Sequence, residues 1–449
     1  MQKLIFYLLL LVPCIGVGQS QWKPLGDLGY TWQIGNVSLI YHDTLTDRLF
    51  ISGTNRYLGD SIEVNGFGIY NGQSVQPAWE YDTTCINFCK PSGPVIRYQN
   101  RLLYAKMEEG AGTKSELLEF DETTQAKTKI ADISGGINHL LVWNNKLIVS
   151  GRFDTINGQP FNDIARWDGI NWQGYGAQEI GKISVATVYQ QELYIAGNFN
   201  NNALKEIARW DGTQWQNVGN GFEEQAWVDA MCVYKGELYA AGYFFKSSGN
   251  AGNFIQKWNG SEWSEVGGGT QTTLGVPNSN AQIHSMLVHH DSLFVSGAFR
   301  YAGELPSDRI AVWDGSRWCG HTYTMRNRVT DMVAYGDRLV FAGARVIGND
   351  TVGAIGEIPF KDFVEHCGPP VAVNEVAASQ FKLFPNPTAG RLQLEAGHPL
   401  VGQPYQIFDG NGRRVKTGVL HNQLELFELE NGIYWLSAGT HTHKLVLLR

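Results

Sequence analysis

The sequence lacks the short motifs that mark the commonest enzyme active sites. Its 449 residues contain no complete G-x-x-x-x-G-K-[S/T] phosphate loop, no H-E-x-x-H zinc motif and no G-x-S-x-G nucleophile turn. Clusters of Lys and Arg are also missing, since only 17% of the residues are charged and the net charge is −8. Nucleic-acid binding depends on phosphate neutralisation. We therefore expect no nucleic-acid partner, no metal or other cofactor, and no enzymatic activity.

Long apolar runs are missing too. No stretch approaches the ~20 apolar residues that a membrane-spanning helix needs. The run from Leu4 to Val12 follows Lys3 and precedes small residues, which is typical of a secretory signal peptide over residues 1–18. A lipoprotein signal at Cys14 is less favoured, because Pro13 stands where a small residue is wanted. The sequence predicts an exported chain without a membrane span.

Cysteine is scarce, with six in the chain and five after residue 18. Pairing is expected outside the cytoplasm, and an odd count leaves one thiol free. Cys85 and Cys89 enclose only three residues, so we predict a disulfide between them. Cys232 lies in the apolar stretch AMCVY and is expected to be a buried free thiol. Pairing of Cys319 with Cys367 is left open.

Glycine and tryptophan are abundant by contrast, and many of them belong to a repeated phrase. ARWDGTQWQNVG at 208–219 returns in similar form at 165–176, 256–267 and 311–320. Asp-Gly or Asn-Gly between β-rich segments supplies the positive φ angles of tight hairpins. The two Trp residues can then face each other across the strand pair. The phrase therefore predicts a hairpin with an aromatic clasp, and its Asp168, Asp211 and Asp314 are expected to be structural.

The repeat extends over most of the chain. A strand ending in a small residue closes at 53, 105, 151, 197, 242, 297 and 343, at intervals of 45 to 55 residues. Units of four short strands at this spacing indicate a β-propeller. We predict an all-β, seven-bladed propeller over residues 19–366, in which the segment 20–26 supplies the missing last strand of the seventh blade. Such pairing would remove an open sheet edge.

The units G-x-F…IARWDG-x-x-W-x-x-x-G resemble those of kelch-type and related secreted propellers. The four middle units carry the resemblance clearly, whereas the first two and the last are degraded. The G-H…W-D pairing of true WD repeats is absent.

The C-terminal residues differ in composition. Residues 367–380 are rich in Pro, Val and Ala and are predicted to be a linker, and residues 381–449 a small β-sandwich. This segment resembles the type A C-terminal sorting domain of the type IX secretion system. The resemblance rests on Phe384, Pro385, Asn386, Pro387, Thr388, Gly390, Asp409, Gly412, Val415, Gly432, Tyr434 and the strand from Lys444 to Leu448. It implies that the type IX machinery is a partner, and that the protein is carried across the outer membrane and is secreted or displayed on the cell surface.

A recognition surface is predicted from the topology of such a propeller. In a four-stranded antiparallel unit, the loops between the second and third strands and between units lie on one face. The length variation falls there, at 54–66, 80–94, 245–254 and 268–282. Variable loops on a rigid scaffold commonly carry binding. The candidate ligand-binding residues are His139, Trp227, His284, Arg328, Tyr57, Phe245, Tyr301 and Arg345, and the alternative for each is a packing role.

Three functional hypotheses follow. The first is a secreted or surface protein that binds an extracellular protein or glycan. The second is an enzyme on the same scaffold, either glycan-active or a kelch-type oxidase, which would need paired acids or clustered His and Tyr at the channel. The third is a purely structural surface component. His289 and His290 precede a hairpin turn and are expected to be solvated turn residues rather than metal ligands.

Overall fold

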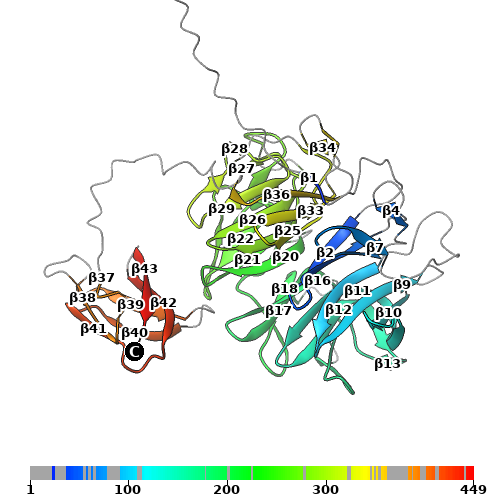
Figure 1. Cartoon of the computed structure of the whole chain (residues 1–449), viewed down its shortest axis with the longest axis horizontal. Helices are drawn as coiled ribbons and strands as arrows, with labels where there is room; N and C mark the ends of the chain where they lie inside the picture. Colours follow the sequence, from blue (N-terminus) through cyan, green and yellow to red (C-terminus); the bar gives the residue numbers. More distant parts are fainter. Residues whose placement is uncertain are drawn as a thin grey trace, which may run out of the picture. The chain divides into compact units, whose positions relative to one another are not determined.

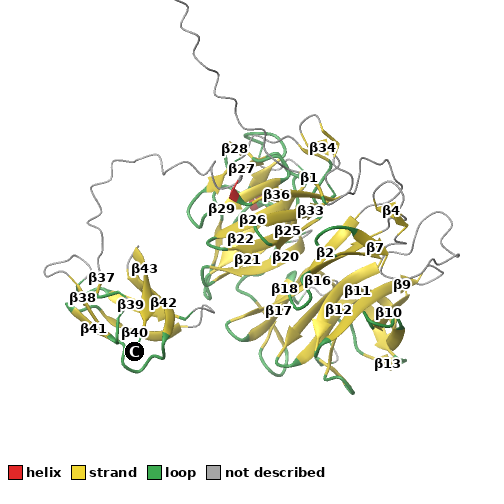
Figure 2. Ribbon diagram, in the orientation of Figure 1, coloured by secondary structure: helices red, strands yellow, loops and turns green. Residues whose placement is uncertain are grey.

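The computed structural model describes residues 23–25, 37–53, 57–58, 62–63, 67–77, 92–108, 114–176, 178–199, 203–223, 226–276, 280–320, 325–343, 346–347, 350–351, 355–361, 383–386, 388–394, 401–409, 414–438 and 441–448. These residues form strands and turns, with one 3-10 helix at Lys246–Ser248 (Figure 2). The chain divides into two compact units, Met1–Cys367 and Gly368–Arg449. The predicted signal peptide and linker lie outside the described residues.

The first unit is built from antiparallel sheets whose strands follow the chain order (Figure 1). One such sheet contains β2 (Val37–Asp43), β3 (Arg48–Gly53), β6 (Phe67–Tyr70) and β7 (Val75–Pro77). Another contains β16 (Gly181–Tyr189), β17 (Glu192–Phe199), β18 (Ile207–Trp210) and β19 (Trp215–Asn217). The next contains β20 (Trp227–Tyr234), β21 (Glu237–Tyr243), β22 (Ile255–Trp258) and β23 (Trp263–Glu265). It is followed by β25 (Ile283–His289), β26 (Ser292–Gly297), β29 (Ile310–Trp313) and β30 (Trp318–Cys319).

Two predicted units are joined in a single sheet, which differs from the expectation of separate four-stranded units. The strands are β8 (Ser92–Tyr98), β9 (Arg101–Glu108), β10 (Lys114–Phe120), β11 (Lys127–Trp143), β12 (Lys146–Ile156), β14 (Ile164–Trp167) and β15 (Trp172–Gly174), with β13 (Gln159–Pro160) paired to β12. The first part of β11 pairs with β10 and the later part with β12. No loop separates the two parts, and Gly135 allows the bend with a φ of 152°.

The last sheet is completed by the N-terminal segment, as the sequence predicts. It contains β32 (Asp331–Tyr335), β33 (Arg338–Ala342) and β36 (Ile355–Pro359), and β1 (Lys23–Pro24) pairs with β36. Lys23 lies opposite Glu357, and Leu25 is fully buried. Residues 20–22 and 26 lie outside the described residues.

The sheets close into a ring. The first strands contact one another in the order β2, β8, β11, β16, β20, β25 and β32, and β32 contacts β2. Apolar clusters fill the spaces between neighbouring sheets, and one of them joins Val37 and Ile51 of the first sheet to Val340 and Ile355 of the last. A closed ring of such sheets is the arrangement of a β-propeller.

The repeated Trp phrase forms the hairpin that ends each middle unit. The Trp residues of a pair are Cα partners, with ring centroids 5.1 to 5.8 Å apart. The Gly residues of the turns have φ between 101° and 106°. Trp263 Nε1 also donates a hydrogen bond to Val218 O of the preceding unit, at 2.9 Å. The phrase therefore holds its own hairpin together and ties it to a neighbouring sheet.

The small residue that ends each second strand also has a structural cause. A Cβ added to Gly151, Gly197, Gly242 or Gly297 would lie 2.0 to 2.1 Å from a carbonyl oxygen of the adjacent first strand. In each case the first strand has a register shift at this point. The repeated Gly therefore makes room for a β-bulge.

Short strands also form within the connecting segments. They are β4 (Tyr57–Leu58) with β5 (Ile62–Glu63), β24 (Thr270–Gln271) with β27 (Tyr301–Ala302) and β28 (Leu305–Pro306), and β31 (Met325–Arg326) with β34 (Val346–Ile347) and β35 (Asp350–Thr351).

The second unit contains two antiparallel sheets. One comprises β37 (Leu383–Phe384), β38 (Arg391–Leu394) and β41 (Gln423–Glu425). The other comprises β40 (Arg414–Val419), β39 (Pro404–Phe408), β42 (Gly432–Ala438) and β43 (His441–Leu447). One apolar cluster draws Leu392 and Leu424 from the first sheet and Ile407, Leu436 and Leu445 from the second.

Candidate functional site

The first strands of the ring carry polar side chains at their bulges. Asn138, Ser184, Asp229 and His284 occupy the bulged position in successive sheets. Their side chains connect neighbouring sheets, since Asn138 Nδ2 donates to Ile183 O at 2.8 Å and Gln282 Nε2 donates to Asp229 Oδ2 at 2.6 Å. The first strands therefore form a polar belt around the inside of the ring.

Asp331 links three sheets in this belt. Its carboxylate accepts hydrogen bonds from Ile40 N at 2.8 Å, Ser285 Oγ at 2.8 Å and Met332 N at 2.9 Å. Burial raises the pKa of Asp331 to about 6, although these hydrogen bonds act in the opposite direction. Sequence reasoning missed both Asp229 and Asp331. The available signal was a polar residue 13 positions before the strand-end Gly in the four middle units, which includes Asp229 but not Asp331.

His139 and His284 lie in the same belt. Burial lowers the pKa of each imidazole to about 4, and the nearby charge of Arg328 contributes at His284. His139 Nδ1 and His284 Nε2 are buried without a hydrogen-bond partner among the described residues. Both side chains are therefore neutral at neutral pH.

Trp227 is the exposed member of an aromatic cluster on the variable-loop face. It begins β20, its side chain is 51% exposed, and its ring lies 6.4 Å from that of Tyr243. Tyr243 contacts Phe245 at 4.9 Å, and Phe245 contacts the buried Phe254 at 5.3 Å. Phe245 therefore packs between Tyr243 and the buried Phe254, while the Trp227 ring is exposed to solvent.

The remaining predicted residues divide into three groups. Arg328 is exposed near His284, in the segment that leads into β32. Tyr301 is partly buried in β27, opposite Gln271 and Pro306. Tyr57 lies in β4, its side chain is outside the described part of the structure, and Arg345 is outside it altogether. The structure therefore brings His284 and Arg328 together and places Trp227 on the neighbouring first strand, whereas His139 lies on β11, which packs between β8 and β16.

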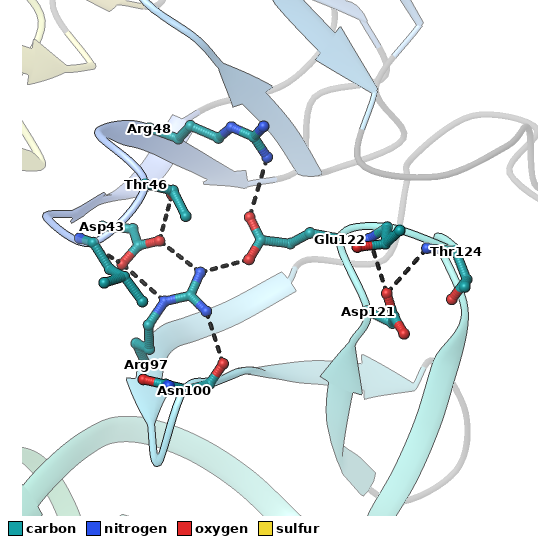
Figure 3. Close-up of polar contacts among 10 residues, drawn as sticks. Asp43, Thr46, Arg48, Arg97, Asn100, Asp121, Glu122 and Thr124 are labelled. Atoms are coloured by element: carbon teal, nitrogen blue, oxygen red, sulfur yellow. Dashed lines mark hydrogen bonds and ion pairs between the residues drawn. The ribbon is translucent and has the colours of Figure 1, made fainter.

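An ion cluster joins the first two repeats on the side of the short turns (Figure 3). Arg97 Nη2 contacts Asp43 Oδ2 and Glu122 Oε2, each at 2.6 Å, and Arg48 Nη1 contacts Glu122 Oε1 at 3.1 Å. Burial favours the neutral form of Asp43, but hydrogen bonds from Arg97, Thr46 and Leu45 keep its pKa below the ordinary value. The hydrogen bonds that Arg97 donates to Asp43 raise the pKa of Arg97. All the charged groups are engaged, so the cluster has a structural role.

The other chemical candidates have structural roles. Asp168 accepts from Ile170 N and Asn171 N, and Asp211 and Asp314 make equivalent turn contacts. His289 is stacked on Phe360 at 3.7 Å, so it packs against the core rather than being the solvated turn residue we predicted. Within the described residues, no three His, Cys, Asp or Glu side chains are grouped as metal ligands.

Two described cysteines can be assigned. Cys232 is free as predicted, is partly buried, and has a pKa raised to about 12 by burial. Cys319 is disulfide-bonded, and its partner lies outside the described residues. The predicted pair Cys85 and Cys89 also lies outside them.

The sorting segment of the second unit has a defined local geometry. Thr388 Oγ1 donates to Arg391 O at 2.7 Å and accepts from Gly390 N and Arg391 N. Asn386 Oδ1 accepts from Val446 N at 2.8 Å, so Asn386 is fastened to the last strand. Tyr434 is buried and its hydroxyl donates to Glu430 O. Gly432 and Lys444 lie on the paired strands β42 and β43, and Pro387 lies outside the described residues.

Residues 382–447 match the family described as "Secretion system C-terminal sorting domain". This domain marks proteins that the type IX secretion system exports to the cell surface or the extracellular space. The protein is therefore an exported one, and its C-terminal domain is the part that the secretion machinery recognises. Within the described residues, no helix has the length and apolar character needed to cross a membrane.

Among solved structures, the chain is similar to the β-propeller domain of the trilobed protease from Pyrococcus furiosus, whose topology is described as an open velcro. The TM-score is 0.44 and the identity 10%, over 73% of this chain and 96% of that one. No curated protein matches the sequence.

Proposed function

We propose that the protein is an exported binding protein, which recognises an extracellular protein or glycan through the variable-loop face of a seven-bladed, kelch-like propeller. The small C-terminal β-sandwich over residues 381–449 supplies the export signal and takes no part in binding. The observation that carries the proposal is the half-exposed ring of Trp227 beside Tyr243. An exposed aromatic ring backed by a packed core is a common binding anchor, because it buries a large area at low entropic cost.

The bonding of the inner-belt carboxylates supports binding rather than catalysis. Asp229 and Asp331 are the carboxylates of the inner belt, and burial raises the pKa of each. Asp229 accepts from Gln282 of the next sheet, and Asp331 holds three sheets together. Carboxylates that are held in such hydrogen bonds do not readily transfer protons to a substrate.

A glycan-active enzyme is the second candidate, because a carboxyl with a raised pKa can serve as a general acid. The kelch-type oxidase is less well supported, because the described residues show no group of metal ligands. The glycan-active enzyme hypothesis would be favoured if the wild-type protein released reducing ends from a polysaccharide and the Asp229→Asn variant did not.

The test is binding of the full chain to arrays of glycans and extracellular matrix proteins. We expect Trp227→Ala to weaken binding about tenfold or more, since hot-spot aromatics contribute about 2 kcal/mol or more. Leu45→Ala removes another exposed apolar side chain, in a short turn of the first sheet, and should leave binding unchanged. Equal binding by wild type and Trp227→Ala would count against the proposal.

A further inference from the structure

A pocket lies on the side of the short turns, opposite the variable loops. It has a volume of about 450 Å³ and is formed where the sheet of β12 and β14 meets the sheet of β17 and β18. Its lining includes Trp143, Ile148, Tyr175 and Trp210, together with the cationic Lys146 and Arg166. This volume is within the range of small-molecule binding sites.

The pocket exists because one repeat differs from the next two at a core position. Tyr194 and Tyr239 occupy equivalent places in β17 and β21, and each ring packs edge-on against Tyr189 or Tyr234 at 5.6 Å. In β12 this place is taken by Ile148, because the strand end LIVSG at 147–151 aligns with LYIAG at 193–197 and LYAAG at 238–242. The smaller side chain leaves the space that a Tyr ring fills in the neighbouring repeats.

The same repeat also differs in charge. Glu192 pairs with Arg209 at 2.8 Å, and Glu237 pairs with Lys257 at 2.7 Å. The corresponding positions in the pocket are Lys146 and Arg166, so a conserved place for an ion pair holds two cations. A pair of like charges is unfavourable unless an anion lies between them.

Lys146 and Arg166 both donate to a neutral side-chain amide. Lys146 Nζ and Arg166 Nε both contact Gln173 Oε1, at 3.3 and 3.2 Å, and within the described residues neither makes an ion pair. Three acids lie nearby, and each already accepts other contacts. Asp168 is close enough to Lys146 for that charge to help lower the Asp168 pKa, and its carboxylate accepts from Ile170 N and Asn171 N. Glu192 binds Arg209, and the Asp211 carboxylate accepts from Thr213 N, Gln214 N and Gln216 Nε2. A bound anion would give the two cations the partner they lack.

The aromatic walls indicate what kind of anion fits. Trp143 and Trp210 are partly exposed, and Tyr175 packs against Trp210 at 5.1 Å. The Tyr175 hydroxyl is buried beside Arg166, whose guanidinium carbon lies 5.3 Å from the Tyr175 ring centroid. Indole faces suit the C–H face of a sugar ring, while the cations suit a carboxylate.

We propose that this pocket binds an acidic sugar residue, with its carboxylate between Lys146 and Arg166 and its ring against the indoles. The site is separate from the surface around Trp227, so either assignment can fail without the other. A uronic acid within an extracellular polysaccharide is the class of ligand that the pocket fits.

The experiment measures binding of a galacturonate oligosaccharide to the full chain by calorimetry, beside a neutral galactose oligosaccharide of equal length and inorganic sulfate alone. We expect the uronate to bind and the neutral sugar to bind about tenfold or more weakly, because a charge-assisted hydrogen bond contributes about 1.5–3 kcal/mol. Binding of sulfate with no binding of the uronate would contradict the sugar assignment. Equal binding of the acidic and neutral oligosaccharides, or no binding of either, would also overturn the proposal.

Two variants use the residues of the neighbouring repeats, so each should fold. Lys146→Glu recreates the Glu192–Arg209 pair, and Ile148→Tyr fills the space as Tyr194 does. Both should abolish uronate binding while thermal unfolding stays at or above the wild-type midpoint. Lys257→Gln breaks an ion pair in the next repeat and serves as the matched control, with binding unchanged. Wild-type affinity in both pocket variants would place the uronate elsewhere.

Discussion

At the scale of single residues, the side chains that recur in each repeat have structural roles. The turn Asp residues cap backbone amides, the Trp pairs clasp hairpins, and the small residues admit a bulge. Function is therefore best sought where a repeat position departs from this rule. Trp227, Lys146 and Ile148 are such departures.

The buried histidines predict an acid-sensitive fold. His139 and His284 have a pKa of about 4 in the folded protein, against about 6.5 in the unfolded chain. The unfolded state therefore binds more protons between these values, so stability is lost as the pH falls from about 6.5 towards 4. We expect His139→Gln to lose less stability than wild type between pH 7 and 5 in chemical denaturation.

The control for this prediction is His290→Gln, which changes an exposed turn residue. Asp331 acts in the opposite direction, because its raised pKa favours the folded state as the pH falls through about 6. Comparing each variant with wild type removes that common contribution. An identical pH dependence in His139→Gln and wild type would mean that burial of this imidazole has no effect on folding.

At the scale of elements, the strand order was predictable and the joined sheet was not. The Trp-flanked hairpins and the closing N-terminal strand follow from spacing, because tight turns and strand pairs have strict residue requirements. The continuity of β11 could not be read from the sequence, since Gly135 and Gly136 look like a turn between two strands. The polar belt was also missed, because long-range pairing alone brings Asp331 to Ser285 and Ile40.

The closing strand is expected to be important for stability. Leu25 is fully buried among residues of the first and last sheets. Leu25→Ala should lower the free energy of unfolding by about 2–5 kcal/mol, because it leaves a cavity at the ring closure. The measurement is guanidinium unfolding followed by Trp fluorescence, with the exposed Leu45→Ala as control. A midpoint shift no larger than that of the control would show that β1 contributes little to the ring.

At the scale of the whole molecule, the second unit carries the export domain, and binding is proposed for the first. The sorting domain was predictable from its motif, because its Pro, Asn and Gly residues serve turn geometry that few other residues allow. The pocket on the short-turn side was not predicted, because it is visible only when the side chains that line it are compared in space. Short turns of uniform length gave no reason to expect a site there.

Export should depend on the geometry around Thr388. Thr388→Val keeps the shape of the side chain but removes three hydrogen bonds that hold the segment before β38. We expect this variant to accumulate inside the outer membrane, measured by cell fractionation and immunoblotting. Thr417→Val changes an exposed residue of β40 and should be exported normally. Wild-type export of Thr388→Val would indicate that the machinery does not read this turn.

The most direct test of the binding role is hydrogen exchange of the full chain with and without the partner selected from the arrays. We expect slowed exchange at the start of β20 and over residues 246–254 in the adjoining loop, with the short turns of the first sheet unchanged. Protection that leaves Trp227 and this loop untouched would contradict it.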